Sequence, residues 1–231
     1  MLNQEIMDIL KRNEQNGWIL EPEAKKILQI YGLDIPEGTL AQSKEEALDF
    51  ARNKGFSLVA KVVSSQIIHK SDVGGVITGI NSEAELTEAC ERLEKLEGFS
   101  GLLLEETVTG TELFLGAKFD NQFGPVVLLG IGGTAVEVYN DVALRMAPLK
   151  KEDIPQMLEE LKGKKLLQGF RGQEAINIEA LSTTVSKFSE LVMDLEKQIE
   201  SIDLNPLFCS AARCIVADAR IMLLTAEQPF A

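Results

Sequence analysis

Cysteine, histidine and aromatic residues are scarce in this chain of 231 residues. It has three cysteines, one histidine and one tryptophan, and 6% of its residues are aromatic. An odd cysteine count without a CxxC pair argues against a disulfide framework and fits a reducing compartment. Cys209 and Cys214 lie on either side of an expected turn with no histidine nearby. We therefore expect them to be small core residues rather than metal ligands.

Long apolar runs and an excess of basic residues are also absent. No window approaches about 18 uninterrupted apolar residues, and the N-terminal segment mixes charged and apolar residues, which predicts a cytoplasmic protein without a membrane role. The chain has 23 Lys and Arg against 36 Asp and Glu, a net charge of −13, which argues against nucleic acid as a partner. A small phosphorylated ligand stays compatible with this charge, because a local pocket of cations and backbone N–H groups can hold it.

Hydrophobic periodicity and capping signals are what the chain does contain. Ser43 and Ser82 each begin a capping box, Ser-Lys-Glu-Glu and Ser-Glu-Ala-Glu, and so each opens a helix. In the first half we expect helices over 1–16, 22–32, 43–55 and 82–96, and strands over 35–40, 57–64 and 74–80.

The second half of the chain predicts mainly strands, followed by a long helix. Gly-containing turns separate strands that we expect to form hairpins over 101–106, 112–120, 124–133 and 135–139. A helix is expected over 151–161, a longer one over 178–195, and two antiparallel strands over 201–208 and 213–221. The fold class is thus α+β: an N-terminal helix, 1–17, packed on the larger lobe, a smaller lobe, 18–98, a larger lobe, 99–231, and a ligand cleft between the lobes.

The two last strands carry oxygen-bearing side chains that suit a metal ion. Asp203 and Asn205 are two residues apart and share a strand face, and a hairpin partner can place Asp218 opposite them. Carboxylate and amide oxygens suit Mg²⁺. The alternative is that Asp203 and Asn205 only shape the turn before Pro206.

Three further features in the chain could bind or transfer phosphate. Lys61 interrupts an apolar strand, where its ammonium needs either a phosphate or an ion pair with Glu105 or Glu106. His69, the only histidine, lies in a loop rich in Ser and Gly; it is either a surface residue or a nucleophile. The glycines in GIGGTAVEVYND, from residue 130, either approach an anion or form a hairpin turn.

Together these segments resemble a known family. KVVSSQIIHKSDVGGV, EETVTGTELFLGAKFDNQFGPVVLLGIGGTAVEVYNDVALRMAPL, LLQGFRG, IDLNPLF and ADARI, in this order and spacing, resemble the ATP-grasp subunit of ADP-forming acyl-CoA synthetases. The resemblance covers residues 18 to 223. It implies an ATP-grasp fold, an acid-thiol ligase of the succinyl-CoA synthetase superfamily, ATP or ADP and Mg²⁺ as ligands, and a phosphohistidine relay.

The resemblance also implies a role for each matching residue. His69 corresponds to the loop histidine that passes phosphate to ADP, and Asn205 and Asp218 to the Mg²⁺ ligands. The nucleotide-binding positions are Lys61 for the phosphates, Glu105, Glu106, Thr107 and Val108 for adenine, Glu112 for the ribose, and Arg145 and Arg171 near the phosphate site.

A separate partner is part of this expectation. No segment resembles a CoA-binding Rossmann domain, so the resemblance implies a CoA-binding alpha subunit, in a two-plus-two heterotetramer. Ser201 replaces a family glutamate and Ala211, Ala212 and Arg213 occupy a turn where glycine is common, which puts the fine geometry of the metal-bearing hairpin in doubt. The alternatives are another ATP-grasp carboxylate ligase, which needs no loop histidine, and a non-catalytic nucleotide-binding regulatory subunit.

Overall fold

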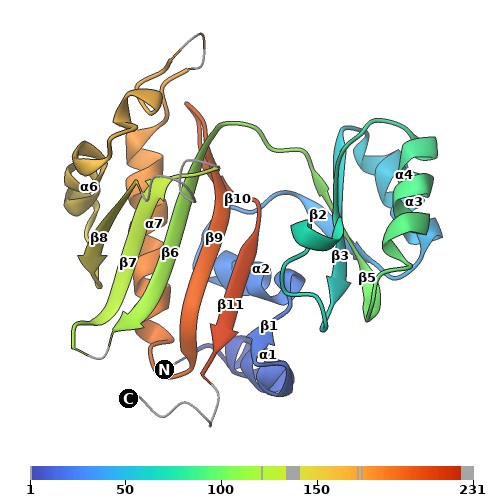
Figure 1. Ribbon diagram of the computed structural model, residues 1–231, viewed down its shortest axis with the longest axis horizontal. Coiled ribbons are helices and arrows are strands. Elements are labelled where there is room, and N and C mark those ends of the chain that lie inside the picture. The colour runs from blue at the N-terminus through green and yellow to red at the C-terminus, as the bar shows by residue number, and fades with distance from the viewer. Residues whose placement is uncertain (1, 121, 134–140, 171, 173, 225–231) are drawn as a thin grey trace. The chain divides into compact units, whose positions relative to one another are not determined.

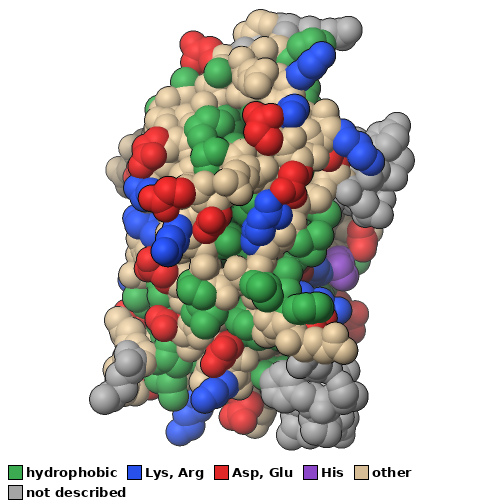
Figure 2. All heavy atoms as spheres, turned by 90° about the vertical axis from the view of Figure 1, so that its left-hand side faces the viewer, with side chains coloured by type: hydrophobic (Ala, Val, Ile, Leu, Met, Phe, Trp, Pro, Cys, Tyr) green, Lys and Arg blue, Asp and Glu red, His purple; other side chains and the backbone are tan. Residues whose placement is uncertain are grey.

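The computed structural model describes residues 2–120, 122–133, 141–170, 172 and 174–224. The chain divides into two compact units: a larger one, Met1–Ile35 with Thr109–Ala231, and a smaller one, Pro36–Val108. Among the described residues, every helix is too short or too polar to cross a lipid bilayer. Figure 2 shows acidic, basic and apolar side chains interspersed over one face, so on this face the acidic excess is not gathered into one patch.

The larger unit is built on an antiparallel sheet (Figure 1). Its strands follow the order β1-β11-β9-β6-β7-β8, and β10 pairs with β9. The strands are β1 (Trp18–Ile19), β6 (Thr111–Asp120), β7 (Gly124–Ile131), β8 (Val142–Met146), β9 (Ile199–Cys209), β10 (Cys214–Val216) and β11 (Ala219–Leu223).

Helices pack on this sheet through the apolar stripes that the sequence predicts. The α-helices are α1 (Gln4–Asn13), α2 (Glu21–Ile30), α6 (Ile154–Glu160) and α7 (Ile178–Asp194), and the 3-10 helices are η1 (Glu14–Asn16), η3 (Lys151–Asp153) and η4 (Lys164–Leu166). Leu181, Val185 and Phe188 of α7 are fully buried in the core of the unit. Their burial confirms the packing role that the sequence predicts for this stripe. Each such side chain contributes about 1.5–3 kcal/mol when buried.

The smaller unit has its own sheet and its own core. Its strands, in the order β2-β5-β3-β4, are β2 (Gly38–Ala41), β3 (Leu58–Ser64), β4 (Val76–Ile80) and β5 (Phe99–Glu106). Helices α3 (Lys44–Lys54) and α4 (Glu83–Leu93) lie side by side on one face of this sheet (Figure 1), and η2 (Ser71–Val73) precedes β4. Ala60 and Val62 of β3 pack with Leu86 and Leu93 of α4 in the core.

Both predicted capping boxes are confirmed as helix starts. The Ser43 and Ser82 hydroxyls accept from the N–H groups of Glu46 and Glu85, each at 3.2 Å. The returning carboxylate of Glu46 accepts from the N–H of Gln42, one residue before the cap, and that of Glu85 likewise from Asn81. Each box therefore satisfies two backbone N–H groups, one in the first helical turn and one directly before the cap residue.

The unit boundaries differ from the predicted 17/18 and 98/99. Strand β5 pairs with β2 and β3, so residues 99–108 belong to the smaller unit. Helix α2 packs against β11, so residues 18–35 belong to the larger unit. Spacing along the chain identifies the strands but not their partners, and the partners decide the unit.

The predicted run of hairpins is correct in part. Strands β6 and β7 form the expected hairpin and β8 pairs with β7, whereas β5 and β6 lie in different sheets. The strand expected over 135–139 lies in the segment 134–140, outside the described residues. The last expected strand is divided into β10 and β11 by residues 217–218, and both parts pair with β9.

Candidate functional site

Lys61 is held by a buried ion pair, one of the two alternatives that the sequence leaves open. Its Nζ lies 3.0 Å from Oε2 of Glu105, and only 5% of Lys61 and 2% of Glu105 are exposed. Lys61 lies opposite Leu103 of β5, and Glu105 follows two residues later on the same face. This face is opposite to the one on which Ala60 and Val62 pack in the core. The strand thus presents a cation on the side away from its helices.

His69 lies in the loop that joins β3 to η2, and its side chain is exposed. The loop closes back onto β3, because the N–H of Gly75 donates to the carbonyl of Lys70 at 2.7 Å and the N–H of Val62 donates to the carbonyl of Gly75 at 2.8 Å. A Cβ on Gly75 would lie 2.7 Å from Cγ1 of Val62, so the close approach requires glycine. The backbone therefore fixes where the histidine loop ends.

Residues 105–108, the predicted adenine-binding segment, comprise the end of β5 and the two residues after it. The N–H groups of Glu106 and Thr107 donate to the carbonyls of Glu37 and Ser57, at 2.9 and 3.1 Å. Glu106 Oε2 lies 3.2 Å from Nζ of Lys54. This segment is thus anchored to its own unit through both backbone and side chains.

Glu112, the predicted ribose ligand, lies near the start of β6, and its side chain is exposed. Its carbonyl accepts from the N–H of Gly132 at 2.8 Å. Gly133 has φ +69, and a Cβ there would lie 3.0 Å from Oε2 of Glu112. Two of the glycines that the sequence singles out therefore allow the chain after β7 to run against this glutamate.

Asn205, within β9, lies beside Asp218, which directly precedes β11. Ala219 pairs with Leu204, so Asp218 and Asn205 take the next positions of the same register. Asn205 is exposed and Asp218 is half-buried. The proximity that the hairpin argument predicts for these two residues is confirmed.

Asp203 has an ion-pair partner that the sequence analysis did not predict. Nη2 and Nε of Arg220, its register partner on β11, lie 2.7 and 3.2 Å from Oδ2 of Asp203. The carboxylate is therefore occupied by a guanidinium. The strand alternation that places Asp218 opposite Asn205 could have identified this pair, because Arg220 is two residues beyond Asp218.

Asn205 and Asp218 offer oxygen donors of the kind that magnesium binds. Within the described part of the chain, no group of three or more His, Cys, Asp and Glu residues could hold a metal ion. Mg²⁺ does not need one, since it is usually bound by one or two carboxylates together with waters and phosphate oxygens. One carboxylate, Asp218, beside one amide, Asn205, is a donor set of this kind.

The structure does not bring Arg145 to the same place. In β8 it pairs with Val127, which is buried in the helix-covered core, and its guanidinium donates to both carboxylate oxygens of Glu160 in α6. These hydrogen bonds raise the pKa of Arg145. Asp203 lies on the opposite face, since Ile202 and Leu204 point into the core. Arg171 lies outside the described residues.

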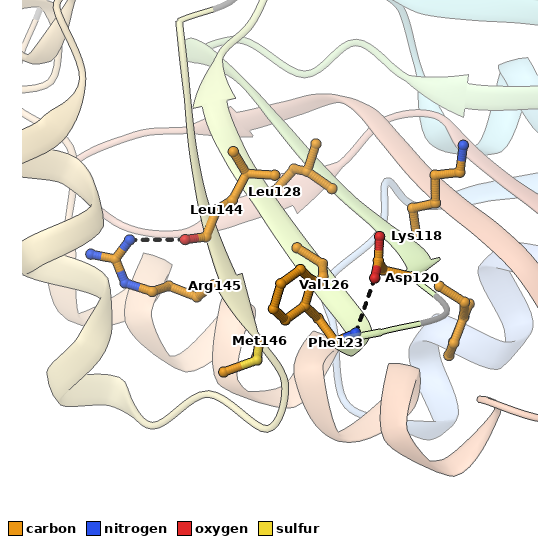
Figure 3. A pocket seen from close by; sticks show the side chains of 9 residues that line it. Lys118, Asp120, Phe123, Val126, Leu128, Leu144, Arg145 and Met146 are labelled. Atoms are coloured by element: carbon orange, nitrogen blue, oxygen red, sulfur yellow. Dashed lines mark hydrogen bonds between the residues drawn. The ribbon is translucent and has the colours of Figure 1, made fainter.

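A shallow apolar hollow lies on the outer face of β6, β7 and β8 (Figure 3). Leu144 and Met146 are 51% and 60% exposed there, and in Figure 3 the Arg145 side chain extends away from them. Besides Arg145, none of the predicted site residues lines this hollow.

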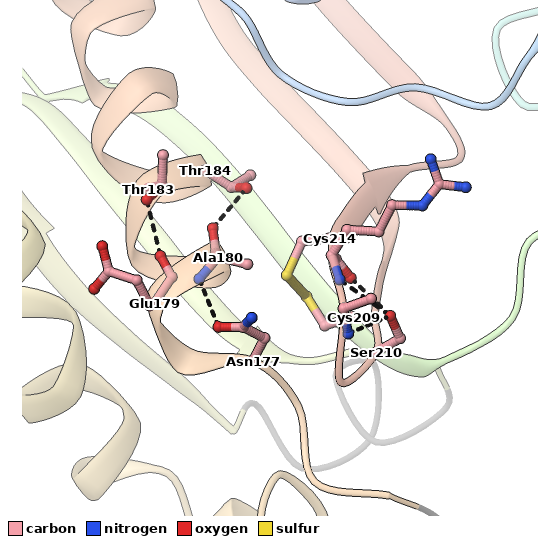
Figure 4. The surroundings of a disulfide bond; sticks show 10 residues. Asn177, Glu179, Ala180, Thr183, Thr184, Cys209, Ser210 and Cys214 are labelled. Atoms are coloured by element: carbon pink, nitrogen blue, oxygen red, sulfur yellow. Dashed lines mark hydrogen bonds between the residues drawn. A yellow bond between two sulfur atoms is a disulfide. The ribbon is translucent and has the colours of Figure 1, made fainter.

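Cys209 and Cys214 are buried, as expected, but they form a disulfide (Figure 4). They are direct register partners of β9 and β10, and their Cα atoms are 4.2 Å apart. This corrects the expectation of a chain without paired cysteines. Cys90, in α4, is the free cysteine, and burial raises its pKa to about 11.

Comparison with known proteins identifies the fold family. The sequence model of a protein family, described as the ATP-grasp domain, matches residues 11–223. The chain belongs to the ATP-grasp family. This ATP-grasp chain is 39% identical to the beta subunit of acetate–CoA ligase [ADP-forming] I from Pyrococcus furiosus, over 93% of this chain and 96% of that subunit. It is 37% identical to the 4-hydroxybutyrate–CoA ligase [ADP-forming] of Nitrosopumilus maritimus, but spans only 33% of that longer protein.

A solved structure is similar over nearly the whole chain. It is that of the dinucleotide-forming acetyl-coenzyme A synthetase 1 of Ca. Korarchaeum cryptofilum, in complex with coenzyme A and Mg-AMPPCP, with its phosphohistidine segment pointing towards the nucleotide-binding site. The TM-score is 0.83 and the identity 39%, with 95% of this chain and 100% of that chain covered. The α+β ATP-grasp fold expected from the sequence is thereby confirmed.

Proposed function

We propose that this protein is the nucleotide-binding beta subunit of an ADP-forming acyl-CoA synthetase. In this role it transfers a phosphoryl group between ADP or ATP and a phosphohistidine relay. The observation that carries the proposal is the exposed His69 on a loop whose end closes back onto β3, in a chain that covers 96% of a beta subunit of an ADP-forming acetate–CoA ligase. A carboxylate ligase that forms its acyl phosphate directly has no use for this histidine.

The residues fit a magnesium nucleotide. Asn205 and Asp218 would hold Mg²⁺, because they are oxygen donors at adjacent positions of paired chain segments. When bound, the ion neutralises charge on the phosphate oxygens. Lys61 would contact the phosphates and Glu112 the ribose, and segment 105–108 would hold adenine. Arg145 is left out, because its guanidinium is bound to Glu160 on the core side of β8.

Phosphoryl transfer requires little covalent chemistry from a protein beyond positioning and charge neutralisation. In the direction of ATP formation, a terminal oxygen of ADP bonds to the phosphorus carried on a His69 nitrogen. The N–P bond breaks, the electron pair returns to the imidazole, and that nitrogen takes up one proton. Lys61 stabilises the charge that gathers on the phosphate oxygens.

A partner subunit completes the proposed enzyme. The relative is named a beta subunit, so a separate alpha subunit is implied. We propose that this partner binds CoA, selects the acyl group and exchanges phosphate with His69, in an α2β2 heterotetramer in the cytoplasm.

The experiment is phosphate analysis of the intact and digested full chain after incubation with Mg-ATP. We expect an acid-labile, alkali-stable phosphate on His69 and none on the His69→Asn variant. That variant should still bind ADP, and the complex reconstituted with it should form no ATP from acyl-CoA. Unchanged turnover by that complex would overturn the relay.

A further inference from the structure

A lysine that the proposed site does not use is buried in helix α2. Lys25 is 2% exposed, and its Nζ lies 2.9 Å from Oε1 of Glu21, itself 2% exposed. The same Nζ donates a hydrogen bond to the carbonyl of Ala217 at 2.7 Å. The helix thus presents a buried cation to the residue directly before Asp218.

Helix packing does not require this arrangement. Ala24, Ile27 and Leu28 bury the apolar face of α2. Burying an ammonium and a carboxylate costs several kcal/mol per ion, and an apolar pair of similar volume is often no less stable. Stability therefore gives a weak reason for this buried ion pair. Its hydrogen bond to the carbonyl of Ala217, which positions the following residue, gives a better one.

Ala217 joins the two segments that carry the proposed metal ligands. Its N–H donates to the carbonyl of Pro206, the residue after Asn205, at 3.0 Å. Its carbonyl accepts from Lys25. Residues 217–218 lie between β10 and β11 and belong to neither strand, so these hydrogen bonds replace those of a strand ladder.

We propose that Lys25, oriented by Glu21, is a positioning residue for the magnesium ligand Asp218. The carbonyl of Ala217 and the N–H of Asp218 belong to one planar peptide group. Holding this carbonyl fixes the peptide group from which Asp218 extends. The Asp218 carboxylate then stays beside the Asn205 amide, and the two side chains bind the same ion. The inference rests on the proposed function, because it assumes that these two residues bind Mg²⁺.

The test measures how far Mg²⁺ strengthens the binding of ADP to the full chain. ADP affinity is determined by calorimetry in EDTA and again in saturating Mg²⁺, and the ratio of the two affinities is the Mg²⁺ enhancement. We expect Lys25→Met to keep the affinity in EDTA and to lose about 10-fold or more of the enhancement, as is usual when a residue supporting a metal ligand is removed. A full enhancement in this variant would overturn the proposal.

A second variant covers the case in which Lys25→Met leaves Glu21 unpaired and fails to fold. Glu21→Gln/Lys25→Met removes both charges, and we expect it to fold and to lose the enhancement to the same extent. Lys187→Met is the matched control, because Nζ of Lys187 also donates to a carbonyl, that of Gly32, at 2.7 Å. It should leave both affinities unchanged. A lowered melting temperature with full enhancement in the double variant would make Lys25 purely structural.

A failure of the proposed function gives a different result from a failure of the inference about Lys25. If the unmodified chain binds ADP equally well with and without Mg²⁺, the assignment of Asn205 and Asp218 is wrong, and the inference about Lys25 is overturned with it. If the unmodified chain and Lys187→Met show the enhancement and Asp218→Asn does not, the site holds. The Lys25 variants then decide the inference alone.

Discussion

At the scale of single residues, the buried ion pair of Lys61 and Glu105 bears both on the stability of the fold and on the proposed binding of the nucleotide phosphates. Removing the lysine alone leaves a buried carboxylate without this partner. We expect Lys61→Met to lower the free energy of unfolding by about 3–5 kcal/mol, measured by urea denaturation. Lys61→Met/Glu105→Leu should recover most of this loss, because it removes both charges.

Binding of ADP separates the two roles of Lys61. If the ammonium contacts phosphate, the stable double variant should still bind ADP more weakly than the unmodified chain. Glu105→Gln serves as the control, because it keeps the ammonium. Normal ADP affinity in the double variant would show that Lys61 acts only in the ion pair and not on the nucleotide.

Whether the neighbours of a site residue can be predicted from the sequence depends on how far along the chain those neighbours lie. The positions of Asn205 and Asp218 follow from strand alternation and one turn. The Asp203–Arg220 pair belongs to the same register and follows in the same way. The contact of Lys25 with Ala217 does not, because these residues become neighbours only when α2 packs beside β11.

At the scale of elements, helix starts and hairpin partners were predictable, and the partners of strands that lie far apart in the sequence were not. A capping box specifies a helix start through side chains three residues apart, so Ser43 and Ser82 are sufficient. The place of β5 depends instead on β2 and β3, which precede it by tens of residues. The same limit explains why the predicted unit boundaries differ from those of the structure.

The hairpin of β9 and β10 gives the prediction at this scale. Cys209 and Cys214 close a short loop of sequence separation 5, and chain-entropy arguments give such a crosslink about 2 kcal/mol of stabilisation. A reductant should therefore lower the unfolding free energy by about that amount. Thiol counting of the denatured chain should find one thiol, Cys90, without reductant and three with it. Three thiols in unreduced protein would contradict the disulfide.

At the scale of the whole molecule, the two units carry cores of different size, and each unit contains a natural probe. Trp18, the single tryptophan, is 4% exposed in the larger unit, and Cys90 is fully buried in the smaller one. The smaller unit buries far fewer apolar residues. Because stability grows with the surface that folding buries, we expect the smaller unit to unfold first.

Urea titration at pH 8 without reductant tests this expectation. In the folded chain the pKa of Cys90 is about 11, so its thiol is protonated and buried at this pH. Unfolding exposes the thiol and returns its pKa toward the ordinary 9.0, which raises the reactive thiolate fraction. Any stability that this shift contributes is present below the unfolded pKa of 9.0 and is lost as the pH rises from there through about 11, so it is nearly constant around pH 8. Thiol labelling should have a lower midpoint in urea than Trp18 fluorescence, and Cys90→Ala should abolish the labelling. Coincident midpoints would instead mean that both units unfold as one cooperative structure.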